Sequence, residues 1–86
     1  MSFVLLGTEG CHLCDDAAAV IVAAVQGAQI DIYQEDIADS ASAVEIYGTR
    51  IPVLKNEVTG AELDWPFGPD DVQRFIRESA EGRTGQ

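Results

Sequence analysis

Both cysteines of this chain, Cys11 and Cys14, stand between a short apolar run at residues 3–6 and a long alanine- and valine-rich run at residues 15–25. Two residues three apart lie on one face of a helix, so both sulfurs can meet on the first turn of a helix that begins here. This spacing permits a reversible disulfide. The pair therefore predicts thiol–disulfide exchange at the start of a helix.

The two cysteines are predicted to have different roles. A thiolate at a helix N-terminus faces unpaired backbone N–H groups and the positive end of the helix dipole, which lowers its pKa from about 8.5 towards neutrality. Cys11, nearer the helix start, is the candidate attacking thiolate, and Cys14 is the candidate resolving thiol. His12 is either a tuning residue, because an imidazolium would favour the Cys11 thiolate, or a solvated loop histidine. The neighbouring Asp15 and Asp16 oppose the thiolate.

The cysteine pair also permits interpretations other than exchange. A structural zinc ion takes four ligands, and His12 is the only further soft ligand in the sequence. Its position between the two cysteines makes simultaneous ligation strained, so we predict no metal site. The remaining interpretations are a metal cluster that bridges two chains through Cys11 and a pair of inert thiols retained by descent.

The length and composition indicate how many domains the protein has and which partners it can bind. Its 86 residues have room for one domain, which we expect at 1–80, followed by a flexible polar tail at 81–86. A hydrophobic share of 47% favours a folded chain over a disordered one. The formal charge of −10 opposes binding to nucleic acid and to anionic membranes, and favours partners with a basic face.

The N-terminal segment predicts the compartment. It carries no basic region, and its apolar run ends at Gly7, too short for a signal peptide or a membrane-spanning helix. We therefore expect a cytoplasmic protein. Since nothing in the sequence resembles a large exposed apolar face, we expect a monomer. In a reducing compartment an isolated Cys-x-x-Cys pair is more typical of catalysis or metal binding than of a structural bridge.

The pattern of apolar and turn-forming residues predicts strands at 3–6, 29–34, 51–54 and 61–65. The first strand is apolar throughout and is expected to be central in its sheet. Helices are predicted after Cys11, after a cap at Asp39 or Ser40, and from Pro69 onwards. The helical residues expected to face the core are Leu13, Ala17, Val20, Ile21, Ala24, Val25, Ala43, Val44, Ile46, Tyr47, Val72, Phe75 and Ile76. The order β-α-β-α-β-β-α is that of an α/β protein with a four-stranded mixed sheet and three helices, the smallest form of the thioredoxin fold.

Three segments carry a family likeness: residues 10–15 (GCHLCD), 49–54 (TRIPVL) and 62–67 (ELDWPF). These segments make the chain resemble small bacterial glutaredoxin-like proteins of the Cys-His-Leu-Cys branch. The resemblance covers nearly the whole chain. The resemblance implies a cis peptide bond before Pro52, with this proline lying against the cysteines. It also implies that the backbone of Ile51 offers hydrogen bonds to the substrate chain.

The chain departs from glutathione-using glutaredoxins at two places. Glu9 stands near the position of their basic residue before the first cysteine, and residues 65–71 (WPFGPDD) replace their Gly-Gly-Asp-like turn. Pro69 removes a backbone donor there, and nearby carboxylates would repel the dianionic glutathione disulfide. We therefore predict no cofactor and disfavour glutathione. Arg50 is the nearby cation that would bind a substrate carboxylate or stabilise the Cys11 thiolate, unless it is a solvated surface charge.

Two functions follow from these observations. The first is a thiol–disulfide oxidoreductase that acts on a protein or small-molecule disulfide through Cys11 and Cys14. The alternative is a non-enzymatic thioredoxin-fold binding module whose acidic surface recognises a basic protein partner, since this fold also hosts proteins without redox activity. A pKa of Cys11 near 8.5 or above would favour binding.

Overall fold

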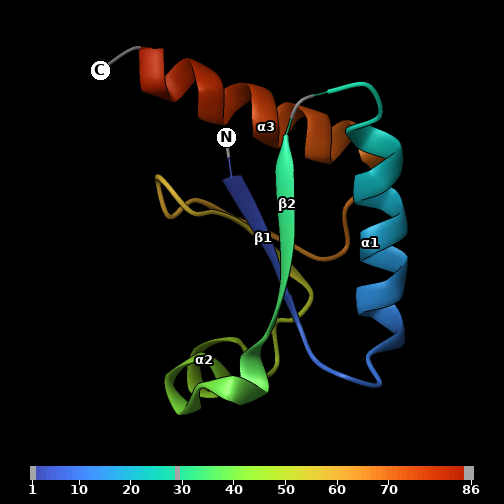
Figure 1. The fold of residues 1–86 in the computed structure, drawn as a ribbon, viewed down its shortest axis with the longest axis vertical. Helices are drawn as coiled ribbons and strands as arrows, with labels where there is room; N and C mark the ends of the chain where they lie inside the picture. The colour runs from blue at the N-terminus through green and yellow to red at the C-terminus, as the bar shows by residue number, and fades with distance from the viewer. Residues whose placement is uncertain (1, 29, 85–86) are drawn as a thin grey trace.

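The structure is a computed structural model that describes residues 2–28 and 30–84. Its elements follow the predicted order β-α-β-α-β-β-α, with one short 3₁₀ helix added (Figure 1). They are β1 (Ser2–Gly7), α1 (His12–Ala24), β2 (Asp31–Asp36), η1 (Ile37–Asp39), α2 (Ala41–Tyr47), β3 (Val53–Asn56), β4 (Glu62–Asp64) and α3 (Pro69–Thr84). The predicted thioredoxin-like fold is confirmed.

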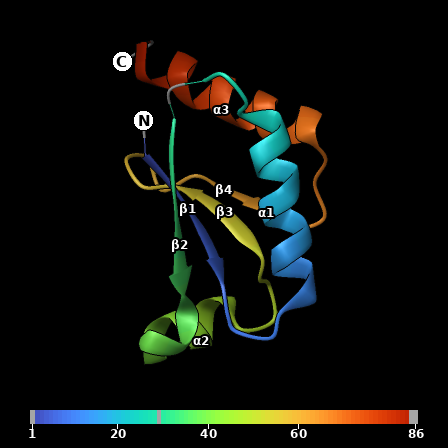
Figure 2. The ribbon, with the colours of Figure 1, turned by 45° about the vertical axis from the view of Figure 1, so that its right-hand side comes forward.

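The four strands form one mixed sheet in the order β2-β1-β3-β4. β1 pairs parallel with β2 and antiparallel with β3, and β3 pairs antiparallel with β4. β1 is therefore internal, as its continuous apolar run predicted. Figure 2 shows that the loop after β1 and the helix α2 lie at the same end of the molecule, where β1 and β2 finish.

Alternate residues of β1 enter two separate cores, because successive side chains of a strand point to opposite faces. Phe3 and Leu5 belong to a core with buried residues of α1 and α3, where the rings of Phe3 and Phe75 meet edge to face at 5.8 Å. Val4 and Leu6 belong to a second core with residues of η1 and α2. Both faces of β1 are thus covered, which positions the loop that follows it.

Three helical residues predicted to face the core are exposed instead: Leu13 by 50%, Val44 by 46% and Ile46 by 57%. Leu13 lies in the first turn of α1, beyond the part of that helix that packs on the core. α2 has only seven residues, and among its larger side chains Tyr47 is the one that is buried. Helical periodicity identifies a face but not how far a neighbouring element covers it.

Some boundaries also differ from prediction. β2 covers Asp31–Asp36 instead of 29–34, with residue 29 outside the described residues, and β3 begins at Val53, after Pro52. Ser40 caps α2 by accepting a hydrogen bond from the Ala43 N–H, and Pro69 opens α3, as predicted. The predicted tail at 81–86 begins within α3, which continues to Thr84, and residues 85–86 lie outside the described part. No helix within 2–28 or 30–84 is long and apolar enough to cross a membrane.

Candidate active site

The cysteine pair lies where β1 passes into α1. Residues 8–10 form the connecting loop, in which Gly10 has a φ of +77°, a conformation that favours glycine. Cys11 is the N-cap of α1 and Cys14 lies in its first turn. Their sulfurs are joined in a disulfide across a Cα–Cα distance of 5.2 Å. The predicted placement of both cysteines at a helix start is confirmed.

The helix start supplies a hydrogen bond to the first sulfur. The Cys14 N–H donates to Cys11 Sγ at 3.1 Å, so Cys11 takes the place that a serine or aspartate oxygen often occupies at an N-cap. Both cysteines are only partly buried. An amide donor and the positive end of the helix dipole would stabilise negative charge on Cys11 Sγ in the reduced protein.

Gly7 is a site residue that sequence reasoning missed. A Cβ placed on Gly7 would lie 2.8 Å from Cys14 Sγ and 3.3 Å from Cys14 Cβ. Real side chains do not approach so closely, so the absence of a side chain at Gly7 lets α1 bring Cys14 against the end of β1. The sequence shows only a glycine at the end of a strand, which is also a normal way for a strand to stop.

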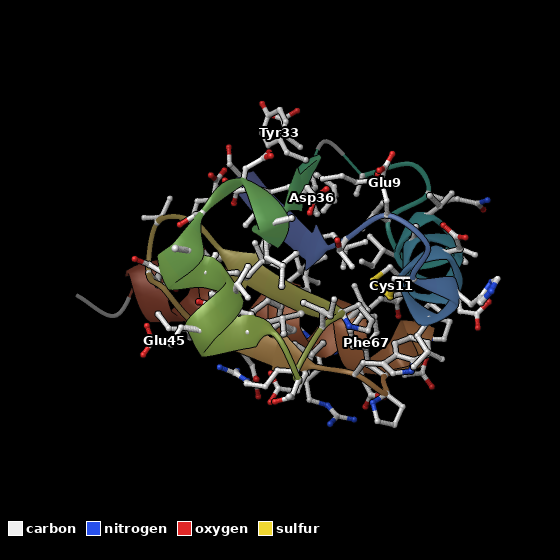
Figure 3. All side chains as sticks on the ribbon, turned by 90° about the horizontal axis from the view of Figure 1, so that it is seen from below. Glu9, Cys11, Tyr33, Asp36, Glu45 and Phe67 are labelled. Carbon is white, nitrogen blue, oxygen red and sulfur yellow. A yellow bond between two sulfur atoms is a disulfide. The ribbon has the colours of Figure 1, made fainter. Side chains whose placement is uncertain are left out.

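A cavity of about 380 Å³ lies beside the disulfide, and both cysteines line it. Its walls also include Glu9 from the loop, Asp15 from α1, and Glu35 and Asp36 from β2. The two β2 residues line the same cavity as the cysteines because β1 and β2 run parallel and end together, with Gly7 opposite Asp36. In the view of Figure 3, Glu9 and Asp36 lie above Cys11 and Phe67 lies below it.

The Ile51–Pro52 peptide bond is cis, and Pro52 is buried. The β1–β3 register pairs Leu6 with Val53, so the next residues along it, Gly7 and Pro52, are brought to the same end of the two strands. Pro52 is thereby placed at the end of the sheet that holds the disulfide. The Ile51 N–H donates to the Tyr47 carbonyl at 3.1 Å and is therefore bonded within the chain. Contact of Pro52 and Ile51 with a substrate stays a prediction.

The family model described as Glutaredoxin-like domain matches residues 2–77. The chain belongs to the glutaredoxin-like family. The X-ray structure of protein XcR50 from X. campestris is 32% identical, has a TM-score of 0.76, and aligns over 88% of this chain and 96% of that one. The solution structure of XcR50 is 35% identical with the same TM-score of 0.76, covering 91% and 95% of the two chains.

Thioredoxin 1 from Thermosipho africanus TCF52B shares the fold, with 16% identity, a TM-score of 0.69 and coverage of 98% of this chain and 99% of that one. The comparison with curated proteins found no match. Membership of the glutaredoxin-like family, together with the Cys11–Cys14 pair, supports a thiol–disulfide redox role.

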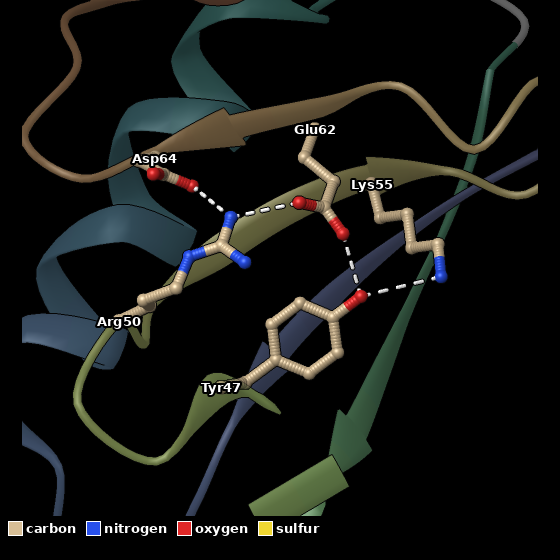
Figure 4. Close-up of polar contacts among 5 residues, drawn as sticks. All are labelled: Tyr47, Arg50, Lys55, Glu62 and Asp64. Atoms are coloured by element: carbon tan, nitrogen blue, oxygen red, sulfur yellow. Dashed lines mark hydrogen bonds and ion pairs between the residues drawn. The ribbon is translucent and has the colours of Figure 1, made fainter. Parts of the chain in front are cut away.

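In this glutaredoxin-like protein Arg50 is held by two carboxylates of β4 (Figure 4). Its Nη2 lies 2.7 Å from Glu62 Oε1 and 2.8 Å from Asp64 Oδ1, and these hydrogen bonds, that with Asp64 first, raise the pKa of Arg50. Sequence reasoning had singled out neither carboxylate. Contact between Arg50 and a substrate stays a prediction.

Tyr47 joins the same cluster. Its hydroxyl donates to Glu62 Oε2 at 2.5 Å and accepts from Lys55 Nζ at 3.3 Å, while the Arg50 guanidinium lies 5.2 Å from the centre of its ring. The hydrogen bond from Tyr47, followed by that from Arg50, holds the pKa of Glu62 below its ordinary value. The cluster links α2, the loop before Pro52 and the two strands of the hairpin.

The turn before α3 is held by contacts between residues 65–71. The Gly68 N–H donates to Asp71 Oδ2 at 2.8 Å, and the next residue is Pro69, which has no N–H. Trp65 and Phe67, at the entry to this turn, pack edge to face at 5.0 Å, and Phe67 is buried. The turn is therefore closed by contacts within the chain.

The remaining predicted site residue, His12, is the first residue of α1 and is exposed. It does not line the cavity beside the disulfide. Within the described part of the chain, no three His, Cys, Asp or Glu side chains gather closely enough to hold a metal ion.

Proposed function

We propose that this protein is a dithiol thiol–disulfide oxidoreductase that acts as a monomer on a protein or small-molecule disulfide. One observation carries the proposal. Cys11 is a partly exposed N-cap residue whose Sγ accepts the Cys14 N–H at 3.1 Å and is bonded to Cys14 Sγ. This arrangement favours a nucleophilic thiolate at Cys11 and a resolving thiol within reach of it.

The reaction proceeds in two exchanges. The Cys11 thiolate attacks one sulfur of the substrate disulfide, that S–S bond breaks, and the second substrate sulfur leaves as a thiolate. The Cys14 thiol then loses its proton to solvent and attacks Cys11 Sγ, which releases the first substrate sulfur. Two electrons have passed to the substrate, and Cys11–Cys14 is left as a disulfide. An external dithiol reduces it again.

Pro52 and the carbonyl of Ile51 dock the substrate chain in this proposal. Support comes from the strand register, which brings Pro52 to the end of the sheet where Gly7 meets Cys14. Arg50 then acts through the loop: its ion pairs with Glu62 and Asp64 hold the segment before Ile51 against β4. A direct bond from Arg50 to a substrate carboxylate belongs to the same proposal.

Glutathione is not the proposed reductant. The Gly68 N–H is already bonded to Asp71, Pro69 offers no donor, and Glu9 lines the cavity beside the disulfide. Reduced glutathione, whose net charge is negative, would meet four carboxylates there. A protein dithiol in a reducing cytoplasm is the electron source that we propose.

A redox titration tests the function. The Cys11–Cys14 pair would be equilibrated with graded dithiol buffers and its state read by alkylation and mass. We expect a reduction potential between about −180 and −270 mV, the range of working exchange catalysts. A disulfide below about −300 mV, or a pair that resists oxidation, would instead support the binding module with a basic protein partner.

A further inference from the structure

Among the described residues, no ion pair joins the carboxylates around the cavity to a cation. The ion pairs of the described residues join Arg50 to Glu62 and Asp64, and Arg74 to Asp71; the cavity carboxylates take part in none of them. None of the described residues that line the cavity is a lysine or an arginine. The disulfide therefore faces a strongly negative field from one side.

An apolar depression adjoins the cavity. This second depression, of about 270 Å³, lies between α1 and β2 and is lined mainly by aliphatic side chains, including Ile21, Val22 and Ile32. Leu5 and Gln34 line both depressions, so the two are adjacent; together they are called the groove, and the second is its apolar part. Val22 is 61% exposed although it is aliphatic. From Asp36 to Ile32 the groove follows β2 for four residues, about 13 Å.

We propose that this groove takes a basic polypeptide segment that carries the substrate disulfide. Positive side chains next to the cystine would occupy the acidic cavity, and an apolar side chain about four residues away would lie on the apolar part of the groove. The inference rests on the proposed function and names its substrate class. The occupant is argued from charge complementarity and from the reactive disulfide in the wall of the cavity.

A cationic substrate also assists the chemistry. The Cys11 thiolate has to form within the field of the cavity carboxylates, which disfavours it. Lysine or arginine side chains brought by the substrate offset that repulsion while the attacking thiolate is needed. Substrate charge should therefore affect the rate of attack as well as binding.

Three disulfide-linked peptide dimers test the charge requirement, with the cysteine flanked on both sides by Lys, Ser or Glu. Reduced protein is mixed with excess peptide, and oxidation of Cys11–Cys14 is followed by acid quench and alkylation. Each second-order rate constant is divided by that of dithiothreitol with the same peptide, which removes the intrinsic reactivity of the peptide. We expect the Lys peptide to exceed the Glu peptide by about tenfold or more at low salt, and the ratio to approach one at 1 M salt.

Two double variants locate the effect. Glu35→Gln with Asp36→Asn removes two charges from the cavity, and asparagine still caps η1 as Asp36 does for the Ala38 N–H. Glu45→Gln with Glu57→Gln removes two exposed charges outside it; Figure 3 shows Glu45 well away from Cys11. We expect the first pair to lower the Lys-to-Glu ratio at least threefold and the second to preserve it.

The apolar part of the groove is tested with a Lys peptide that carries Leu or Ser four residues from the cysteine. We expect the Leu peptide to react severalfold faster, and Val22→Asn to remove that advantage. Equal rates for Lys and Glu peptides, or equal loss in both double variants, would overturn this inference alone. Failure of reduced protein to exchange with any peptide would overturn the proposed function together with it.

Discussion

Gly7 and Cys14 are in such close approach that a methyl group on Gly7 would lie 2.8 Å from Cys14 Sγ. The end of β1 and the first turn of α1 are therefore matched in shape at the resolving cysteine. Gly7→Ala should lower the free energy of unfolding by about 1–3 kcal/mol, the usual cost of overpacking a filled site. Urea denaturation measures this change.

A double-mutant cycle assigns that cost to the sulfur. Under reducing conditions, Gly7→Ala should be less destabilising in a Cys14→Ala background than in the wild type, because the nearer of the two contacting atoms is gone. The same cost in both backgrounds would show that the strain lies elsewhere in β1.

Variants of the two cysteines should distinguish the attacking role of Cys11 from the resolving role of Cys14. Cys11→Ser removes the attacking thiolate and should abolish exchange, whereas Cys14→Ser should accumulate mixed disulfides between Cys11 and the substrate. Non-reducing mass spectrometry after incubation with a peptide disulfide measures both. Equal residual exchange in the two variants would contradict these role assignments.

His12 should raise the reduction potential of the Cys11–Cys14 disulfide. It is exposed at the first position of α1, directly after the Cys11 N-cap, so its imidazolium favours the thiolate over the thiol. His12→Asn should raise the pKa of reduced Cys11 and make the disulfide harder to reduce, by on the order of 20 mV. A potential unchanged by the substitution would identify His12 as a solvated residue without influence on the pair.

The Tyr47–Glu62 hydrogen bond should make stability depend on pH. In the folded protein the pKa of Glu62 is held below its ordinary value of 4.5. Ionised Glu62 therefore adds its full contribution to the free energy of unfolding above pH 4.5, and this contribution is lost as the pH falls through the pKa of the folded state. Tyr47→Phe should cost about 1–2 kcal/mol at pH 7 and less below pH 4, measured by urea denaturation. Tyr33→Phe deletes a hydroxyl from an exposed tyrosine and serves as the control. A cost that stays constant with pH would contradict the assignment to Glu62.

The stability of the start of α3 should depend more on Asp71 than on Asp70. Asp71 Oδ2 accepts the Gly68 N–H at 2.8 Å, so Asp71→Ala should cost about 1 kcal/mol in thermal or urea unfolding. Asp70→Ala removes an exposed acidic residue of the same turn and should cost about half as much. If glutathione reduces Asp71→Ala but not the wild type, the closed turn is what excludes it.

The order of elements, the central place of β1, the placement of Cys11 and Cys14 at a helix start and the opening of α3 at Pro69 were all predictable from sequence, because each depends on local patterning. Apolar runs, helix caps and prolines determine the secondary structure of the few residues around them, so they can be recognised in the sequence. The cis bond before Pro52 followed from family resemblance, since a proline alone accepts either isomer.

The rest was decided by packing between distant segments. Strand register brings Glu35 and Asp36 beside the disulfide, and hairpin pairing places Glu62 and Asp64 on Arg50. The contact of Gly7 with Cys14 joins the end of β1 to the first turn of α1. Leu13 is exposed because the first turn of α1 lies beyond the part of the helix that packs on the core. Such relationships depend on how sheets and helices are arranged in space, so the acidic cavity and the apolar depression beside the cysteine pair could be found only from the tertiary structure.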